Sequence, residues 1–376
     1  MTDSKIRVLI GANDLVLAGV QRLVIEQLQG LDRSRFDVAL VILRQFPGKE
    51  TFDDLIPADV RVYRLDFGRL LDVSEWIKLI GILRRERPRV VKTATFFSNA
   101  LFLTLRPLFG YRVIAAEHNT VAMKPRWQRA ADRWLFARAF TIVADSKQVA
   151  DFVAESEGIP REKFSVVYNG VDLARIEEAK AKYAPMRASI RKEHDVPEDA
   201  FVFFTVARLV KQKNHVLMVE AFARVREAHP EAFLVIAGDG ALRQEIEARA
   251  AELGVKNAVV MLGEQKNIYR YYAASDAFLL TSRHEGFCIA AMEGLAFGMP
   301  LISTKVAGVS EYLKDSVNGY FTEHNAVDIA EKMTKVLLMS DEEVASFSRA
   351  GIETAGEYSI ERYRSGVNEL LLSAAR

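Results

Sequence analysis

The sequence lacks the features that define several large classes of enzyme. It contains one cysteine, Cys288, among 376 residues, which excludes an internal disulfide framework and fits a reducing compartment. No group of Cys, His, Asp or Glu residues has the spacing of metal ligands, and no Ser-centred nucleophile motif is present. We therefore expect no resident metal and no cofactor, and we disfavour a metalloenzyme and a serine hydrolase.

Long apolar runs are also missing. The longest apolar stretch, residues 96–116, is interrupted by Asn99, Arg106, Pro107 and Arg112, which argues against a membrane-spanning helix. The first ten residues have the pattern of a strand after a short polar start, and they lack the apolar core of a signal peptide. The sequence therefore predicts a cytoplasmic protein, either free or held peripherally on the cytoplasmic face of a membrane.

The chain has almost no net charge overall, but one part of it is strongly basic. The chain has 51 Lys and Arg against 50 Asp and Glu, and this balance gives no reason to expect a nucleic-acid partner. Residues 84–138 nevertheless hold 12 basic and 3 acidic residues. Within them, the segment that begins at Lys124 and ends at Arg138 carries Trp127 and Trp134 at helical spacing. Such a stripe is more often a core face, and the alternative is a basic surface that rests on anionic lipid.

Short apolar runs alternate along the chain with longer segments of helical periodicity. This alternation favours βαβ units, and a charge- and alanine-rich interruption at residues 173–198 divides a chain too long for one core. We predict an α/β protein with two doubly wound, Rossmann-like domains, residues 1–172 and 199–357, joined by a partly helical linker. The expected strands are residues 6–10, 36–42, 60–63, 90–93, 112–116, 141–144, 164–167, 201–206, 233–237, 259–262, 277–281, 301–303 and 319–322.

The most informative stretch is residues 284–300. An apolar strand ends in hydroxyls at Thr281 and Ser282, a loop carries Glu285, and a helix carrying Glu293 stops at Pro300. The start of such a helix offers unpaired backbone N–H groups to an anion. One carboxylate in the loop and one in the helix can hold two hydroxyl-bearing parts of one ligand. A phosphate between two hydroxyl-rich groups describes a nucleotide sugar.

Two cations follow the strand predicted at residues 201–206. Because open α/β sheets bind ligands at the carboxyl ends of their strands, Arg208 and Lys213 suit a diphosphate there. The alternative is a solvated loop with ordinary surface charges. Gly238 and Gly240 end the next strand; a tight turn is the favoured interpretation, and backbone contact with a nucleotide is the alternative.

The N-terminal half offers weaker candidates. The loop that ends at Gly19 lacks the G-x-G-x-x-G fingerprint, which disfavours a simple NAD enzyme, yet its helix start could bring N–H groups to a phosphate or sugar. His118 follows a predicted strand and could bond a sugar hydroxyl, or it could be a loop histidine satisfied by its neighbours. Cys288 has apolar neighbours, and we interpret it as a packed, inert residue.

Together these residues resemble the retaining glycosyltransferases of family 4, which are built on the GT-B fold. The resemblance spans nearly the whole chain. Two features depart from it: Ala18-Gly-Val-Gln-Arg22 stands where many relatives have a Gly-Gly-x-Glu-Arg pattern, and Cys288 stands where they often have Gly. The residues that carry the resemblance are Glu285-Gly-Phe-x5-Glu293, Gly298-x-Pro300, Arg208, Lys213, Asn169-Gly-Val-Asp172, Gly238-Asp-Gly240, Gly308 and Glu311.

The resemblance implies a site as well as a fold. Two Rossmann-like domains would face each other across a cleft, the second holding the donor, and the helix at about residues 358–376 would cross back onto the first. Arg208 and Lys213 would grip the diphosphate, Glu293 would bind the ribose hydroxyls, and Glu285 would lie by the donor sugar. The remaining site residues would be His118 in the catalytic group, and Gly286, Phe287, Cys288, Ile289, Gly19 and Gly238 in donor binding.

The function implied is transfer of a hexosyl group, with retention, from a UDP- or GDP-linked sugar to a hydroxyl acceptor. A lipid-linked or cell-surface glycan precursor is the expected acceptor, because the basic segment of the N-terminal half suits a phosphate-bearing one. Two alternatives stay open: a nucleotide-sugar 2-epimerase on the same fold, and a non-catalytic subunit that binds sugar nucleotides.

Overall fold

The computed structural model describes residues 5–17, 19–69, 72–117 and 126–376, apart from the side chains of Arg126 and Trp127. The chain forms two compact units, each with its own parallel sheet. Unit 1 consists of Met1–Asn169 and Ile360–Arg376, and unit 2 consists of Gly170–Ser359. The last helix thus returns to the unit that contains the N-terminal half.

Unit 1 is built on a sheet of seven strands that all run parallel, in the order β3-β2-β1-β4-β5-β6-β7. Its strands read as short apolar runs because a parallel sheet is covered on both faces. They are β1 (Ile6–Ala12), β2 (Phe36–Ile42), β3 (Arg61–Arg64), β4 (Val90–Thr93), β5 (Arg112–Glu117), β6 (Thr141–Ala144) and β7 (Phe164–Val166).

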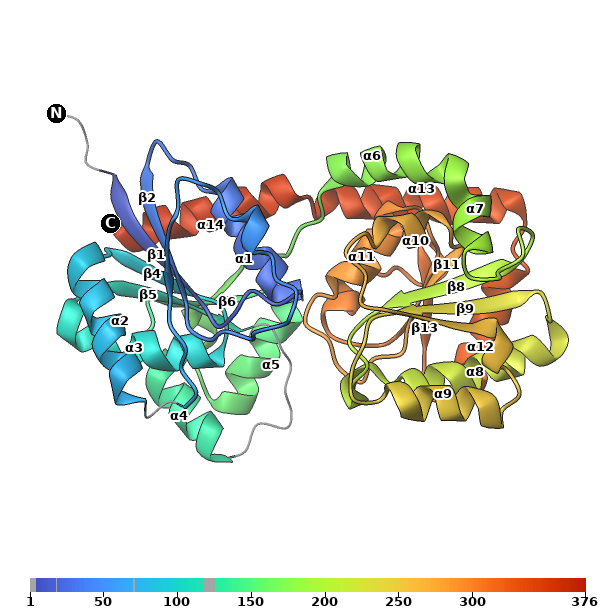
Figure 1. Cartoon of the computed structure of the whole chain (residues 1–376), viewed down its shortest axis with the longest axis horizontal. Helices are drawn as coiled ribbons and strands as arrows, with labels where there is room; N and C mark the ends of the chain where they lie inside the picture. Colours follow the sequence, from blue (N-terminus) through green and yellow to red (C-terminus); the bar gives the residue numbers. More distant parts are fainter. Residues whose placement is uncertain (1–4, 18, 70–71, 118–125) are drawn as a thin grey trace. The chain divides into compact units, whose positions relative to one another are not determined.

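Helices cover both faces of this sheet (Figure 1). One face carries a core in which buried side chains of four helices pack on the strands. The other face carries two helices that are tied together: the Gln27 amide donates to the Tyr363 hydroxyl (2.6 Å), and Arg364 pairs with Glu26 (2.8 Å). The first four are α2 (Val73–Glu86), α3 (Phe96–Phe109), α4 (Arg126–Phe136) and α5 (Lys147–Glu157); the other two are α1 (Gly19–Gly30) and α14 (Ile360–Ala375).

Unit 2 repeats the architecture with a six-stranded parallel sheet in the order β10-β9-β8-β11-β12-β13. The strands are β8 (Phe201–Val206), β9 (Ala232–Ala237), β10 (Val259–Gly263), β11 (Ala277–Leu280), β12 (Leu301–Thr304) and β13 (Gly319–Thr322). In Figure 1 one face is covered by α8 (His215–Ala228), α9 (Arg243–Glu252) and α12 (Ala326–Leu337). The other is covered by α6 (Leu173–Tyr183), α7 (Arg187–Lys192), α10 (Tyr269–Ala273), α11 (Ile289–Ala296) and α13 (Asp341–Glu357).

The segment expected to be a linker, residues 173–198, belongs to unit 2. It forms α6 and α7, and α6 packs against α10. Arg191 is only 3% exposed and pairs with Asp276 (2.8 Å), which also pairs with Arg187 (2.5 Å). A carboxylate 85 residues further along the chain therefore anchors these helices, so part of the charge in the predicted linker belongs to an ion-pair network within unit 2.

The strands agree closely with the sequence prediction, and all thirteen expected segments are strands in the structure. The helix α3 occupies most of the long apolar stretch that the sequence analysis had judged unsuited to a membrane. Among the described residues, no helix combines the length and apolarity needed to cross a bilayer.

Candidate active site

Two loops meet at the carboxyl edge of the unit 2 sheet, where β8 and β11 lie side by side. From β8 the chain proceeds to β9 and β10 on one side of the sheet, and then to β11 and β12 on the other. Such a reversal leaves a crevice between the two strand ends, and open α/β sheets bind ligands there. The loop after β8 contains the 3-10 turn Lys211–Lys213, and the loop after β11 contains Glu285.

Hydrogen bonds tie these two loops together. The Gln212 side chain donates to the His284 carbonyl (2.9 Å), and the Arg283 N–H donates to the Gln212 carbonyl (2.8 Å). The Thr281 hydroxyl donates to the Lys213 carbonyl (3.1 Å). Since both loops start from adjacent strands, these bonds hold the side chains that they carry at fixed separation.

Lys213 and Glu285 form a buried ion pair at this junction. The Lys213 Nζ lies 2.5 Å from the Glu285 Oε1, and the Ser282 hydroxyl donates to the same oxygen at 2.5 Å. The two side chains are 16% and 7% exposed. Burial is the largest single influence and lowers the pKa of Lys213, but the charge and hydrogen bond of Glu285 and the nearby Cys288 together outweigh it, so the pKa is raised. The lysine is therefore held as a cation beside the strand ends.

Arg208 lies on the same loop, just after β8, and is exposed. In the described part of the chain its guanidinium has no carboxylate partner. Its positive charge is the smallest of the influences on the pKa of Lys213, and it lowers that pKa. The edge thus presents one cation paired with Glu285 and one open to solvent.

His215 is the first residue of α8, two residues after Lys213 in the sequence, and it was not among the predicted site residues. It is 1% exposed, and neither ring nitrogen has a hydrogen-bond partner among the residues that the structure describes. Burial, with a smaller contribution from the Lys213 charge, lowers the pKa of His215 to about 4. The imidazole therefore stays neutral at pH 7 and adds no further positive charge to the site.

The glycine-rich part of the loop is fixed by backbone packing. The Phe287 side chain is 1% exposed, and the Tyr312 hydroxyl donates to its carbonyl (3.0 Å). A methyl group on Gly308 would lie 1.5 Å from the Gly286 carbonyl oxygen, so only glycine fits at this contact. The turn Gly308–Glu311 thereby supports the residues that lead into α11.

Cys288 and Ile289 form the start of α11. Cys288 has a φ of 57°, in the left-handed region that favours glycine, and precedes the first helical residue, Ile289. Burial, and next the Glu285 charge, raise the pKa of the Cys288 thiol to about 12, in keeping with an inert packed residue. The first N–H groups of α11 have no partner within the helix and follow directly after the Glu285 loop, so they can receive an anion.

Glu293 lies further along α11 and is held by two phenols. The Tyr269 hydroxyl donates to Glu293 Oε1 (2.9 Å), and the Tyr272 hydroxyl donates to Glu293 Oε2 (3.1 Å). Neither tyrosine was recognised in the sequence. The sequence shows these two tyrosines three residues apart, just before a predicted strand. It does not indicate that they contact Glu293.

The other predicted donor residues have different surroundings. The Gly238 N–H donates to the Gly263 carbonyl (2.7 Å), and a methyl group on Gly238 would lie 2.0 Å from the Ala207 carbonyl oxygen. The close turn at Gly238 therefore leaves no room for a side chain, which is the interpretation that the sequence favoured. Gly19 is exposed at the start of α1 in unit 1, with open space around it. His118 lies outside the described residues.

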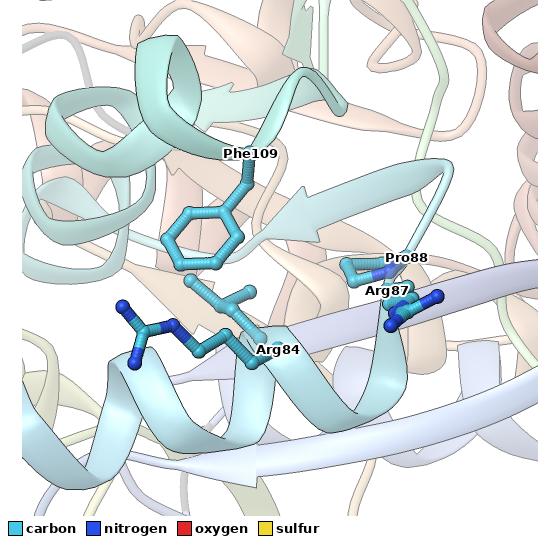
Figure 2. A pocket seen from close by; sticks show the side chains of 5 residues that line it. Arg84, Arg87, Pro88 and Phe109 are labelled. Carbon is cyan, nitrogen blue, oxygen red and sulfur yellow. The ribbon is translucent and has the colours of Figure 1, made fainter.

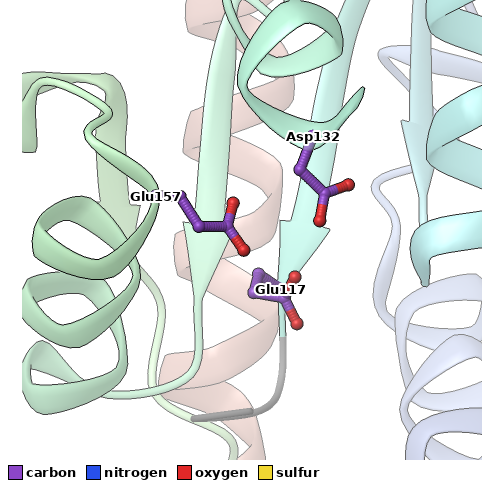
Figure 3. Close-up of side chains that lie close together, drawn as sticks. All are labelled: Glu117, Asp132 and Glu157. Atoms are coloured by element: carbon purple, nitrogen blue, oxygen red, sulfur yellow. The ribbon is translucent and has the colours of Figure 1, made fainter. Parts of the chain in front are cut away.

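Unit 1 holds a group of three buried carboxylates that no spacing in the sequence revealed. Glu117 at the end of β5, Asp132 on α4 and Glu157 on α5 direct oxygens toward one another, all within 4.8 Å (Figure 3). Carboxylate oxygens are the ligands that Mg²⁺ and Ca²⁺ prefer. None of the three is without an interaction partner, and an acidic cluster alone assigns no ion.

A cavity of about 410 Å³ in unit 1 lies between the ends of α2 and α3 (Figure 2). It is lined by Leu83, Arg84, Arg87, Pro88 and Phe109. Because β4 and β5 begin just after these residues, the cavity lies at the amino edge of the sheet. Ligands of open α/β sheets bind at the opposite, carboxyl edge, so this cavity is not where the sequence places a donor or an acceptor.

The basic segment of α4 presents its second tryptophan to solvent. Trp134 is 55% exposed, and the Arg138 guanidinium lies 3.5 Å from its ring centre. The core positions are instead taken by Leu135 and Phe136, at 5% and 0% exposure. The core interpretation of the tryptophan stripe was therefore wrong for Trp134, because the helix turns its next two side chains inward.

Comparisons with known proteins match both units. The family model described as "Glycosyl transferases group 1" matches residues 186–354, and the model described as "Glycosyltransferase Family 4" matches residues 17–175. The first match contains Arg208, Lys213, Glu285 and Glu293. The second contains Gly19 and the carboxylate group of unit 1.

Named relatives extend these matches. UDP-Gal:alpha-D-GlcNAc-diphosphoundecaprenol alpha-1,3-galactosyltransferase of Escherichia coli is 25% identical over 344 residues, which is 87% of this chain and 86% of the relative. N-acetylgalactosamine-N,N'-diacetylbacillosaminyl-diphospho-undecaprenol 4-alpha-N-acetylgalactosaminyltransferase of Campylobacter jejuni is 28% identical over 208 residues, 55% of this chain and 53% of the relative. The solved structure of Anabaena HepE with UDP and glucose has a TM-score of 0.85 at 18% identity, covering 98% of this chain and 100% of that one. This last likeness shows the fold.

Proposed function

From the premise that this chain belongs to the family 4 glycosyltransferases of the GT-B fold, we propose that it transfers a hexosyl group from a UDP-linked sugar, with retention, to a hydroxyl acceptor. The Lys213–Glu285 pair at the strand switch point of unit 2 carries the proposal, since it sets a charged lysine and a carboxylate where a nucleotide sugar would lie. The choice of UDP rests on relatives whose names include it.

In the proposed reaction the diphosphate is the leaving group. Arg208, Lys213 and the first N–H groups of α11 would stabilise the negative charge that develops as the bond between the anomeric carbon and the phosphate oxygen breaks. The acceptor oxygen would bond to the anomeric carbon on the same face, and its proton would pass to the departing phosphate. Glu285 would contact the sugar, and Glu293 would bind the ribose hydroxyls.

The charges of these side chains suit catalysis without a required metal. Transfer should therefore persist in EDTA and should not rise when Mg²⁺ is added back. Loss of activity in EDTA that is restored by Mg²⁺ would contradict this part of the proposal. Glu117, Asp132 and Glu157 would then be the metal ligands to test.

The test of the donor site is a pair of variants, Arg208→Ala and Lys213→Ala. Each should lower turnover by at least about 100-fold, the cost of removing one preorganised donor to a developing charge, while the fold survives. Lys211→Ala is the matched control, because Lys211 is exposed on the same turn. Near-normal turnover in both site variants would refute the phosphate assignment.

The donor and the stereochemistry need separate measurements. A thermal-shift comparison of UDP and GDP should give the larger shift with UDP. NMR of the product should show the anomeric configuration of the donor sugar. Interconversion of the sugar nucleotide without any acceptor would instead indicate a 2-epimerase.

We propose a lipid-linked glycan precursor as the acceptor, reached at an anionic membrane surface through the segment from Lys124 to Arg138. Exposed Trp134 stacked with Arg138, beside exposed Arg133, is the combination that suits a lipid headgroup region. The two bacterial relatives name undecaprenol-linked acceptors. Arg133→Glu together with Trp134→Ala should abolish co-sedimentation with anionic liposomes, and equal sedimentation of variant and wild type would refute this surface.

A further inference from the structure

A pair of tyrosines holds the Glu293 carboxylate. The proposed transfer reaction assigns no role to either tyrosine. Both phenols come from the short helix α10, three residues apart, so their side chains lie on one face of the helix. Tyr269 donates to Oε1 and Tyr272 donates to Oε2 of the same carboxylate. A carboxylate has about four acceptor positions, and the phenols take one on each oxygen. Both oxygens are thereby held in a defined plane.

The two phenols are themselves held rigidly. Tyr272 is 1% exposed and stacks on Phe278 with ring centres 5.8 Å apart. Its single hydroxyl proton is shared between the Ala290 carbonyl (2.9 Å) and Glu293 Oε2 (3.1 Å). Tyr269 is half-buried, and the guanidinium of Arg175 lies 5.3 Å from its ring centre. The carboxylate is therefore oriented by groups whose own rotamers are fixed by packing, which is how a binding geometry is preorganised.

We propose that Tyr269 and Tyr272 are positioning residues for ribose recognition: they hold the Glu293 carboxylate so that its two oxygens accept from the two neighbouring hydroxyls of the ribose. The inference rests on the proposed function, in which Glu293 binds the ribose. A vicinal diol needs two acceptors side by side, and a carboxylate whose plane is fixed supplies them without an ordering cost at binding. Recognition of ribose over 2′-deoxyribose then depends on phenols that do not touch the nucleotide.

The chain offers a matched control on the same helix. Tyr271 is 6% exposed, and its hydroxyl donates to the Gln265 side chain (3.3 Å) rather than to Glu293. Tyr271→Phe thus removes one hydroxyl from α10, as Tyr269→Phe does, but leaves the carboxylate contacts in place. Any loss that comes from loosening α10 affects both variants alike.

The experiment compares UDP with 2′-deoxy-UDP by calorimetric titration of four proteins: wild type, Tyr269→Phe, Tyr271→Phe and Glu293→Gln. The wild type should prefer UDP by about tenfold or more, the value of a hydrogen bond to a charged group. Tyr269→Phe should reduce this preference by about threefold to tenfold, Glu293→Gln should reduce it at least as much, and Tyr271→Phe should leave it unchanged.

The outcomes separate the inference from the proposed function. An unchanged preference in Tyr269→Phe, together with a reduced one in Glu293→Gln, would overturn the positioning role while keeping the ribose assignment. Equal losses in Tyr269→Phe and Tyr271→Phe would overturn it as a general effect of α10. An unchanged preference in Glu293→Gln, or no binding of UDP by the wild type, would overturn the proposed function itself.

Discussion

The substitution Glu285→Gln isolates what the buried ion pair does before a donor arrives. At 2.5 Å and an effective dielectric constant of about 20, the attraction between Lys213 and Glu285 is about 7 kcal/mol. Desolvation of two largely buried groups offsets most of it, and removing one partner of such a pair typically costs about 3–5 kcal/mol. We therefore expect the ligand-free variant to be less stable by about 3 kcal/mol.

The same change should make the site bind UDP more tightly. In the wild type a diphosphate must share Lys213 with Glu285, whereas in the variant the diphosphate is its only anionic partner. A recovered charged hydrogen bond is worth about 1.5–3 kcal/mol, so the dissociation constant for UDP should fall by about tenfold to 100-fold. Transfer from a UDP-sugar should fall at the same time, because Glu285 is proposed to contact the sugar.

The pH dependence of this gain has a definite sign. Without Glu285, burial dominates and the pKa of Lys213 falls below its usual value, whereas in the wild type it is raised. The tighter binding of the variant should therefore fade as pH rises, while wild-type binding changes less over the same range.

The assay is calorimetric titration of UDP at pH 7, with urea unfolding of the ligand-free proteins. Glu220→Gln is the control, since Glu220 forms a partly exposed ion pair with Arg249 (2.7 Å) elsewhere in unit 2. UDP affinity in Glu285→Gln equal to or weaker than that of the wild type would refute the reasoning.

Three further predictions follow from single contacts. Gly308→Ala should abolish UDP binding in calorimetric titration, because its methyl group would meet the Gly286 carbonyl. Gly81 has open space around it in α2, so Gly81→Ala should stabilise unit 1 by up to about 1 kcal/mol in calorimetric unfolding. Cys288→Gly should keep UDP binding and raise the stability of unit 2 by about 1 kcal/mol, since φ is 57° there; a loss of stability in thermal unfolding would contradict it. His215 has a folded-state pKa of about 4 against 6.5 unfolded, so the unfolded chain binds the extra proton as pH falls from 6.5 to 4, and stability should drop by about 3 kcal/mol over that window. His215→Gln should remove that drop in urea unfolding, and an equally steep pH dependence in the variant would count against it.

The strands could be predicted because a parallel strand that is covered on both faces is a short apolar run, and such a run is easily distinguished from the longer amphipathic helices around it. Segments such as Val90–Thr93 and Thr141–Ala144 match the prediction residue for residue. The loop that carries Glu285 was found for the same reason, since a strand, a turn and a helix stop frame it.

Contacts across long sequence separations could not be predicted from patterns. Lys213 and Glu285 are 72 residues apart, and only the order of the strands brings their loops together. Tyr269 reaches Glu293 over 24 residues for the same reason. The prediction for Trp134 was wrong because a tryptophan stripe at helical spacing fits either a core face or a basic surface, and the sequence does not show that Leu135 and Phe136 pack inward instead.

A crystal structure of the protein with UDP tests the central claim most directly. We predict the diphosphate within hydrogen-bond distance of the Lys213 Nζ and the Arg208 guanidinium, with the ribose hydroxyls on the Glu293 carboxylate. A nucleotide bound elsewhere, such as in the cavity lined by Arg84 and Arg87, with Lys213 still paired only to Glu285, would contradict the claim.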